Sequence, residues 1–251
     1  MKRPQRKIKL IGSSLGVYLG GSILASAASF TLISGSNLDS NGWSNDDGGP
    51  NQEPGAGDTG LINSDGVYNS ANWVNSGAIL MTGGNIVSAG PSRNFNFSSA
   101  TGDGSFTITG GTIDSRGILA NRNTINLLGG TWTVGSGTTG SNVGAGNGGL
   151  LTIGGDFVLL NSRTTAHTYS DGDVVFNSDW TGSWENDTVD LAGWRTELTS
   201  GNYSLDDTTI TGAVFDANFQ VVGNTLSLVP EPSSAALVGL GGLALILRRR
   251  K

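Results

Sequence analysis

The stretch Thr107-Ile108-Thr109-Gly110-Gly111-Thr112-Ile113 contains the signal from which the architecture of this chain follows. On both sides of the two glycines, Thr and Ile alternate with a period of two, which is typical of strands with one buried face. The glycines allow a positive φ, or a close approach of two backbones, that a residue with a Cβ atom rarely tolerates. The motif therefore predicts two short strands joined at a glycine corner.

The same motif recurs along the middle of the chain. The first glycine of each pair stands at position 83, 110, 129 or 154, so the intervals are 27, 19 and 25 residues. A degenerate fifth copy, Thr209-Ile210-Thr211-Gly212, has Phe215 three residues after its glycine. In the four complete copies, the large apolar side chains at this offset are Ile86, Ile113, Trp132 and Phe157. This recurrence indicates a repeat architecture.

Repeats near 20–27 residues, each a strand, a glycine corner and a second strand, fit the rungs of a solenoid. One rung cannot bury its own apolar face, whereas a stack of rungs can. No window between the two ends of the chain shows a convincing 3.6-residue pattern. The sequence therefore predicts an all-β fold, a right-handed parallel β-solenoid with irregular rungs. An antiparallel β-sandwich whose hairpins carry glycine is the alternative.

The charges of the chain are segregated. Of its 14 basic residues, five lie in the first nine positions and four are the last four, Arg248 to Lys251. Residues 28–231 hold the other five, all Arg, against all 20 acids, so their net charge is 5 − 20 = −15. A domain this acidic repels nucleic acid and anionic lipid headgroups, so we expect no nucleic-acid partner. With no Cys in the chain, stability must come from burial and backbone hydrogen bonds.

The N-terminal end has the pattern of a signal peptide, predicted to span residues 1–27. Met1–Lys9 is basic, Leu10–Ala25 is apolar, and Ala25-Ser26-Ala27 supplies the small residues that signal peptidase accepts, with cleavage before Ala28. An uncleaved membrane anchor is the alternative. The apolar stretch is interrupted by Gly20-Gly21-Ser22 and is shorter than the ~20 residues of a usual spanning helix, which favours cleavage.

The C-terminal end combines three features in a fixed order. Val229-Pro230-Glu231-Pro232-Ser233 leads into the apolar segment Ala235–Leu247 and then into Arg248-Arg249-Arg250-Lys251. Each proline biases the residue before it away from the α conformation, so the Pro-Glu-Pro stretch should be extended and accessible. Ser233–Leu247 as a helix would span about 22 Å, short of the roughly 30 Å hydrocarbon core. We therefore expect a transient stop in the inner membrane, with the basic end at the cytoplasmic face.

This tail, residues 229–251, resembles the PEP-CTERM sorting signal. The resemblance implies that an exosortase, a membrane-embedded cysteine transpeptidase, recognises Pro230-Glu231-Pro232 and removes the tail. It also implies a Gram-negative producer with an exopolysaccharide matrix, export past the inner membrane, and a final place at the cell surface or in the matrix. The stretch from Trp43 through Pro54–Thr59 also resembles the beginning of autotransporter-type passenger repeats.

Between the two ends, composition divides the chain into three parts. Residues 28–60 are predicted to be a polar lead into the solenoid, residues 61–178 the β-repeat domain, and residues 179–228 a β cap. A cap is expected because an open solenoid end would template aggregation. Its last stretch, Phe219–Leu228, predicts a hairpin that turns at Gly223-Asn224.

Chemical motifs are few, and we assign no catalytic, cofactor-binding or metal-binding residue. His167 is the only imidazole, which excludes a metal site with two His ligands. Three Asp pairs fit a glycosidase, although acids at turns are more often solvated or bound to their own backbone. These pairs are Asp171 and Asp173, Asp187 and Asp190, and Asp206 and Asp207. A polyuronate lyase is disfavoured because the domain has no Lys and only scattered Arg.

Calcium is the best of the cofactor candidates. Asn37-Leu38-Asp39-Ser40-Asn41-Gly42 places oxygen-bearing side chains at alternate positions before a glycine, as a calcium loop does. However, Gly48 stands where the bidentate Glu of such a loop belongs. The leading hypothesis is therefore a non-catalytic structural protein of the surface or matrix. The alternatives are a carbohydrate-binding module, with the clustered Trp180, Trp184 and Trp194 as a sugar platform, and a polysaccharide-active β-helix enzyme.

Overall fold

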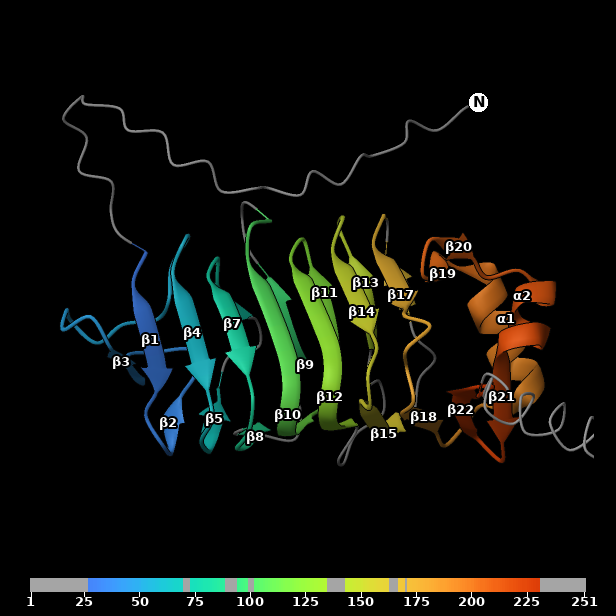
Figure 1. Cartoon of the computed structure of the whole chain (residues 1–251), viewed down its shortest axis with the longest axis horizontal. Coiled ribbons are helices and arrows are strands. Elements are labelled where there is room, and N and C mark those ends of the chain that lie inside the picture. Colours follow the sequence, from blue (N-terminus) through green and yellow to red (C-terminus); the bar gives the residue numbers. More distant parts are fainter. Residues whose placement is uncertain are drawn as a thin grey trace, which may run out of the picture.

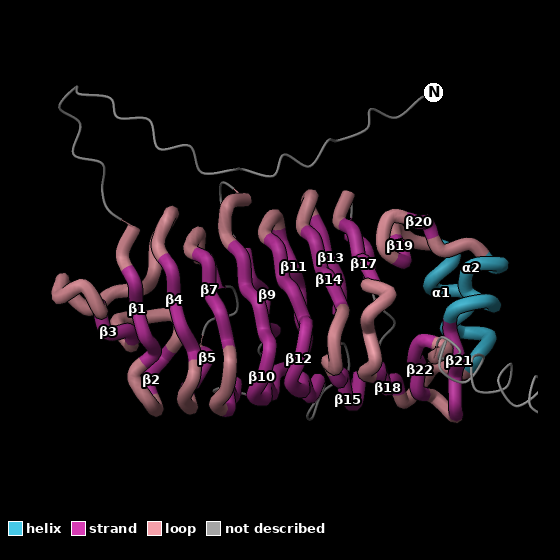
Figure 2. Tube along the Cα trace, in the orientation of Figure 1, coloured by secondary structure: helices cyan, strands magenta, loops and turns pink. Residues whose placement is uncertain are grey.

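The structure is a computed structural model. It describes residues 27–69, 73–88, 94–98, 102–134, 143–162, 167–169 and 171–230. Most of the structure consists of short strands, and two short helices lie at the C-terminal end (Figures 1 and 2). The all-β class is thus confirmed, and the structure adds two helices that no sequence periodicity indicates.

A first row of strands runs along the whole domain (Figure 1). Each strand pairs in parallel with the strand of the next repeat. The register places Phe106 between Ile79 and Ile125, and all three side chains are buried. The row consists of β1 (Ser29–Leu32), β4 (Thr59–Ile62), β7 (Ala78–Met81), the first half of β10 (Ser105–Ser115), the first half of β12 (Thr124–Val134), β14 (Leu150–Ile153), β17 (Asp173–Phe176) and β19 (Tyr203–Leu205).

A second row is reached after the glycine corners, and its strands also pair in parallel. It consists of β2 (Ser36–Asn37), β5 (Gly66–Tyr68), β8 (Asn85–Ser88), the second halves of β10 and β12, β15 (Val158–Ser162) and β18 (Ser183–Asn186). Because β10 and β12 continue from the first row into the second, both rows belong to one sheet.

A third row forms a separate five-stranded sheet, again with parallel pairing. It consists of β6 (Trp73–Val74), β9 (Asn94–Ser98), β11 (Gly117–Asn121), β13 (Val143–Gly146) and β16 (His167–Tyr169). Its aromatic side chains meet those of the other rows in the core. The ring centroid of Phe95 lies 5.1 Å from that of Phe106 and 5.0 Å from that of Trp132.

The glycine corners stack directly on one another. The second glycine of each pair has a positive φ, for example +91° at Gly111 and +80° at Gly130. A Cβ atom on Gly130 would lie 2.6 Å from the carbonyl oxygen of Gly111, and one on Gly111 would lie 2.7 Å from that of Gly84. Both conditions predicted from the sequence, a positive φ and close backbone approach, are therefore confirmed.

The apolar positions after the corners agree with the sequence in three copies out of four. Ile86, Ile113 and Trp132 are buried and aligned side by side. In the fourth copy Phe157 is buried as well, but the residue aligned with Trp132 is Leu159. Leu159 stands two residues further from its corner than Trp132 does, and Phe157 lies directly before the first residue of β15.

The predicted fifth copy is not a corner. Thr211 is the N-cap of helix α2 (Gly212–Asn218), and its hydroxyl accepts a hydrogen bond from the Val214 amide at 3.3 Å. The same Thr-Gly pair thus begins a helix, since Thr is a favoured N-cap residue. Phe215 is buried on this helix and stacks on Phe219, with ring centroids 5.5 Å apart.

At the N-terminal end, the stack begins inside the segment predicted as a polar lead. β1 already pairs with β4, and its other edge is covered by β3 (Trp43–Asn45) in antiparallel orientation. The Trp43 indole is buried and donates a hydrogen bond to the Leu38 carbonyl at 2.8 Å. The first edge of the sheet is therefore protected by the chain itself.

At the C-terminal end, a cap combines strands and helices (Figure 1). β21 (Phe219–Val222) and β22 (Thr225–Leu228) form the predicted hairpin, with a positive φ at Gly223, and β22 pairs antiparallel with β18. β20 (Thr208–Thr209) pairs antiparallel with β19. The 17-stranded sheet is thus mixed, with its antiparallel pairs at the two ends.

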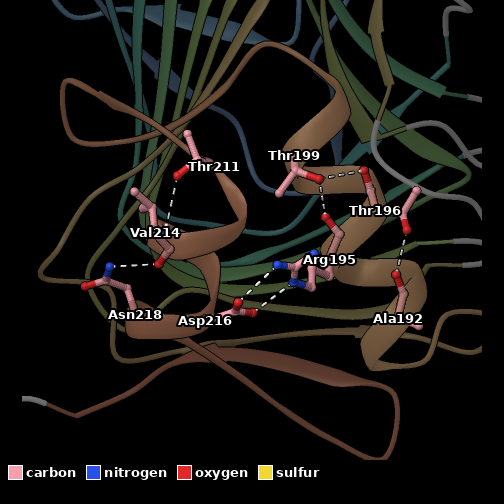
Figure 3. A network of polar contacts seen from close by, with 8 residues as sticks. All are labelled: Ala192, Arg195, Thr196, Thr199, Thr211, Val214, Asp216 and Asn218. Atoms are coloured by element: carbon pink, nitrogen blue, oxygen red, sulfur yellow. Dashed lines mark hydrogen bonds and ion pairs between the residues drawn. The ribbon is translucent and has the colours of Figure 1, made fainter.

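Helix α1 (Leu191–Ser200) packs beside α2 in this cap and is held to it by an ion pair (Figure 3). Arg195 donates two hydrogen bonds to the Asp216 carboxylate, at 2.9 and 3.0 Å, and these bonds keep the pKa of Asp216 below its ordinary value. Both side chains are largely exposed, so the pair orients the helices more than it stabilises the cap.

Candidate functional site

The predicted signal-peptidase site lies where the chain enters the fold. Ala27 is exposed and precedes the first strand, whereas Ala28 is half-buried against the core. The Ala28 amide donates a hydrogen bond to Asp58 Oδ1 at 2.9 Å, and its carbonyl accepts one from the Thr59 amide at 2.9 Å. Among the described residues, Ala28 is thus the first with hydrogen bonds to the fold. Ala25 lies outside the described residues.

The predicted sorting tail begins directly after the last described strand. Strand β22 ends at Leu228, and the Val229 amide donates a hydrogen bond to the Asn218 carbonyl at 2.8 Å. Pro230 follows at once and is exposed. It has no N–H for a further strand hydrogen bond, so the first proline of the motif also ends the last strand. Glu231, Pro232 and Arg248–Lys251 lie outside the described residues.

A groove of about 510 Å³ adjoins this junction. Its walls come from the turn before β18 and from the β21–β22 hairpin, including Asp179, Thr181, Gln220 and Pro230. Asp179 is the one carboxylate among its lining residues. The beginning of the Pro-Glu-Pro stretch is thus part of the surface of the cap, with only Val229 between strand and motif.

The three Asp pairs proposed for catalysis are on the surface. Asp190 caps helix α1 by accepting a hydrogen bond from the Gly193 amide at 2.9 Å. Asp206, with a φ of +50°, accepts one from the Ser178 amide at 3.0 Å. These two acids have backbone roles of the kind expected at turns and caps. The other four are exposed: Asp171, Asp173, Asp187 and Asp207. His167 is in β16, where its backbone aligns with Gly144.

The Trp and Phe side chains are in the core. Each of the six Trp side chains is at most 2% exposed, including the clustered Trp180, Trp184 and Trp194. Trp184 and Trp194 pack edge to face, with centroids 5.1 Å apart, and the Trp180 indole donates to the Phe157 carbonyl at 2.9 Å. All eight Phe side chains are buried as well. The clustered Trp residues therefore fill the cap and form no exposed sugar platform.

A polar cluster near the N-terminal end had no sequence signal. Burial and the neighbouring Asp39 raise the pKa of Glu53 to about 7, although contacts with the side chains of Trp73 and Asn75 lower it. The side-chain N–H groups of Trp73 and Asn75 are buried without a well-aligned hydrogen bond, and Asp39 Oδ1 is buried without one. Asp39 comes from the predicted calcium loop, and Asn37 in that loop instead accepts a hydrogen bond from Asn69 at 2.8 Å.

A second groove, of about 490 Å³, crosses the outer face of β1, β4, β7 and β10. Its lining is made mostly of hydroxyl and small apolar side chains, together with Leu61, Leu80 and one carboxylate, Asp46. Leu80 is 40% exposed. Asp46 is bound at the edge of the groove by the Thr31 hydroxyl, which donates a hydrogen bond to it at 2.8 Å.

The described residues contain neither a metal cluster nor a membrane-spanning helix. Among residues 27–230, apart from the gaps named above, no three His, Cys, Asp or Glu side chains are gathered as a metal site. Within the same residues, no helix has the length and apolar character needed to cross a membrane. The apolar segment Ala235–Leu247, predicted to enter the membrane transiently, lies outside them.

The described β-domain thus ends one residue before the predicted sorting tail. A comparison with protein families identifies a PEP-CTERM protein-sorting motif at residues 228–251. The chain therefore carries the sorting signal that its tail resembles. This signal implies export, association with the envelope or surface, and processing by signal peptidase and an exosortase. No curated protein and no solved structure matches the chain.

Proposed function

We propose that the chain is a non-catalytic structural protein of the cell surface or extracellular matrix, delivered there when its tail is cut at Pro230-Glu231-Pro232. The observation that carries the proposal is where the aromatic and acidic side chains lie. The Trp and Phe side chains, which could stack on sugars, fill the core. Each of the two grooves has a single carboxylate, whereas glycosidases need two across the scissile bond.

We further infer that the domain is a right-handed parallel β-solenoid with irregular rungs. Parallel pairing between strands of successive repeats supports this interpretation, because hairpins of a sandwich pair antiparallel. The 19-residue interval between Gly110 and Gly129 contains one strand of each row, which makes it the shortest complete rung. Longer intervals then place their additional residues in loops between rows.

A carbohydrate-binding role is the second candidate, and the groove over β1, β4, β7 and β10 is the observation that favours it. Hydroxyl groups along the groove, such as those of Thr31 and Thr107, can donate and accept hydrogen bonds with sugar hydroxyls. Leu61 and Leu80 offer apolar contacts for the faces of sugar rings. The ligand would be a neutral segment of exopolysaccharide, because the acidic domain repels anionic chains.

The test uses the exported protein purified from the surface of the producing strain. It is incubated with neutral and acidic exopolysaccharide, and both retention on the glycan and release of reducing ends are measured. The structural proposal expects neither. Retention that is lost in Leu80→Asp but kept in Val222→Asp, an exposed control on the β21 strand, would establish the binding role. Release of reducing ends that Asp171→Asn or Asp173→Asn abolishes in a folded protein would overturn the non-catalytic proposal.

A further inference from the structure

We propose that removal of the signal peptide before Ala28 creates an ion pair within the fold, between the new α-ammonium group of Ala28 and the carboxylate of Asp58. This inference rests on the proposed export of the chain. It adds a role for Asp58, which no sequence motif singles out.

The acceptor is already in place before the cut. Asp58 Oδ1 accepts the Ala28 amide at 2.9 Å, and Asp58 Oδ2 accepts the Gly55 amide at 2.9 Å. The Asp58 amide in turn donates to the Gly55 carbonyl at 3.0 Å. The loop from Gly55 to Asp58 is thus closed by two hydrogen bonds and holds the carboxylate against Ala28. The Ala28 carbonyl accepts from the Thr59 amide, which fixes Ala28 on its other side.

The cut changes the chemical nature of the hydrogen-bond donor, the Ala28 nitrogen, but not its position in the fold. Hydrolysis breaks the bond between the Ala27 carbonyl carbon and the Ala28 nitrogen; water supplies the oxygen of the Ala27 carboxylate and the hydrogen that the amine gains. Near pH 7 the amine carries a further proton, because α-amino groups ordinarily have a pKa of about 7.7–8.0. The neutral N–H that bound the Asp58 carboxylate becomes an ammonium group, so a hydrogen bond with one ionised partner becomes an ion pair with two.

The charge balance of this end of the stack favours the ion pair. Residues 28–92 contain six acids, and no Lys, Arg or His. Two of these acids adjoin the terminus: Asp47 accepts the Ser29 amide at 2.8 Å, and Asp46 accepts the Thr31 hydroxyl at 2.8 Å. After the cut, the α-ammonium is the one positive charge carried by residues 28–92. All three carboxylates attract it, and Asp58 alone has a hydrogen bond to the nitrogen that bears it.

The sequence makes this group unusually easy to observe. Residues 28–250 contain no Lys, so the α-amine is the one primary amine of the mature domain, and Lys251 adds a second only where the tail is retained. Reductive methylation of the exported protein with 13C-formaldehyde labels the α-amine, keeps its positive charge and leaves one N–H. The pH titration of the labelled resonance then gives the pKa of this amine directly.

We expect the α-amine of the wild-type protein to titrate about one pH unit above its ordinary range, because an opposite charge lies within hydrogen-bonding distance. Asp58→Asn should return the pKa to that range. Asp47→Asn is the matched control, since it removes a carboxylate that binds the next amide, and it should leave most of the rise. Equal effects of the two substitutions, or an ordinary pKa in the wild type, would overturn the proposal.

A second variant keeps the test independent of the folding of Asp58→Asn. Insertion of one Gly between Ala27 and Ala28 moves the terminus by one residue when cleavage occurs before the insert, and it leaves every acid unchanged. The α-amine of this protein should titrate in the ordinary range. Mass spectrometry separates the possible failures: a mature N-terminus other than Ala28 contradicts the ion pair alone, whereas an uncut C-terminal tail contradicts the proposed delivery.

Discussion

Substitution of a corner glycine tests whether the stacked corners hold the domain together. In Gly130→Ala, the new Cβ would lie 2.6 Å from the Gly111 carbonyl oxygen and 3.0 Å from the Gly110 carbonyl carbon. Both neighbours are backbone atoms, so no side chain can rotate away to relieve the contact. The position also has a φ of +80°, which residues other than glycine seldom adopt.

Two controls separate these effects. Gly223→Ala has a φ of +66° with no atom within 4 Å of the new Cβ, so it measures backbone strain alone. Gly83→Ala is not in the positive-φ region, and its nearest neighbour is the Asn63 carbonyl oxygen at 3.9 Å. We expect strain of about 1–2 kcal/mol for Gly223→Ala. Gly83→Ala should be neutral or slightly stabilising, because alanine restricts the unfolded chain more than glycine does.

Gly130→Ala adds a steric cost of about 1–3 kcal/mol to the same strain, for a total near 3 kcal/mol. For a domain of this size, 1 kcal/mol shifts Tm by about 2–4 °C, so the expected decrease is about 6–12 °C. Thermal unfolding followed by circular dichroism at the strand signal measures it. A Tm for Gly130→Ala equal to that of Gly223→Ala would show that the corners can separate at no cost, and the argument from close backbone approach would then be wrong.

Three further predictions concern the core, the polar cluster and the tail. Ile108→Asp should unfold the domain, because a buried unpaired charge costs several kcal/mol, whereas Thr107→Asp on the outer groove face should remain folded by circular dichroism. Glu53 has a pKa of about 7 in the fold and 4.5 as its reference, so the folded state binds more protons and stability falls as pH rises between these values. Glu53→Gln should therefore raise stability at pH 8 by about 1–2 kcal/mol, given the partial exposure of this side chain, and leave it unchanged at pH 4, as denaturant unfolding at the two pH values will show. Glu231→Ala removes the only charge of the Pro-Glu-Pro stretch and should leave uncut protein in the inner membrane; mass spectrometry that finds normal C-terminal processing would exclude this role.

The elements that sequence reasoning found are those with local signals. A positive φ at Gly111 or Gly130 and a turn at Gly223 follow from residue identity alone, as does the alternation in β10. The sorting motif that begins at Pro230 was also found, because its residues are contiguous, whereas cleavage before Ala28 stays a prediction. Local signals therefore gave the strand class, the corners and the sorting motif.

The elements that it missed depend on residues from separate parts of the chain. Helix α1 buries only Trp194 and Leu198, one turn apart, which is too short a stripe for a periodicity search, although Asp190 before it was a possible N-cap signal. Leu159 takes the position expected for Phe157 because the fourth corner is longer by two residues. The environment of Glu53 and the acceptor role of Asp58 arise only after distant segments meet, so no motif could show them.

The two processing junctions are related to the fold in opposite ways. At the C-terminal junction, the last hydrogen bond before the motif is that of Val229, and Pro230 contributes none, so a cut within Pro-Glu-Pro removes no strand pairing. At the N-terminal junction, the cut keeps every contact of Ala28 and gives its nitrogen a charge. The parallel row from β1 to β19 separates the two ends by seven strand spacings, about 34 Å. Sites so far apart without shared partners act independently. The order of the two cuts therefore does not alter the stability that the mature domain reaches.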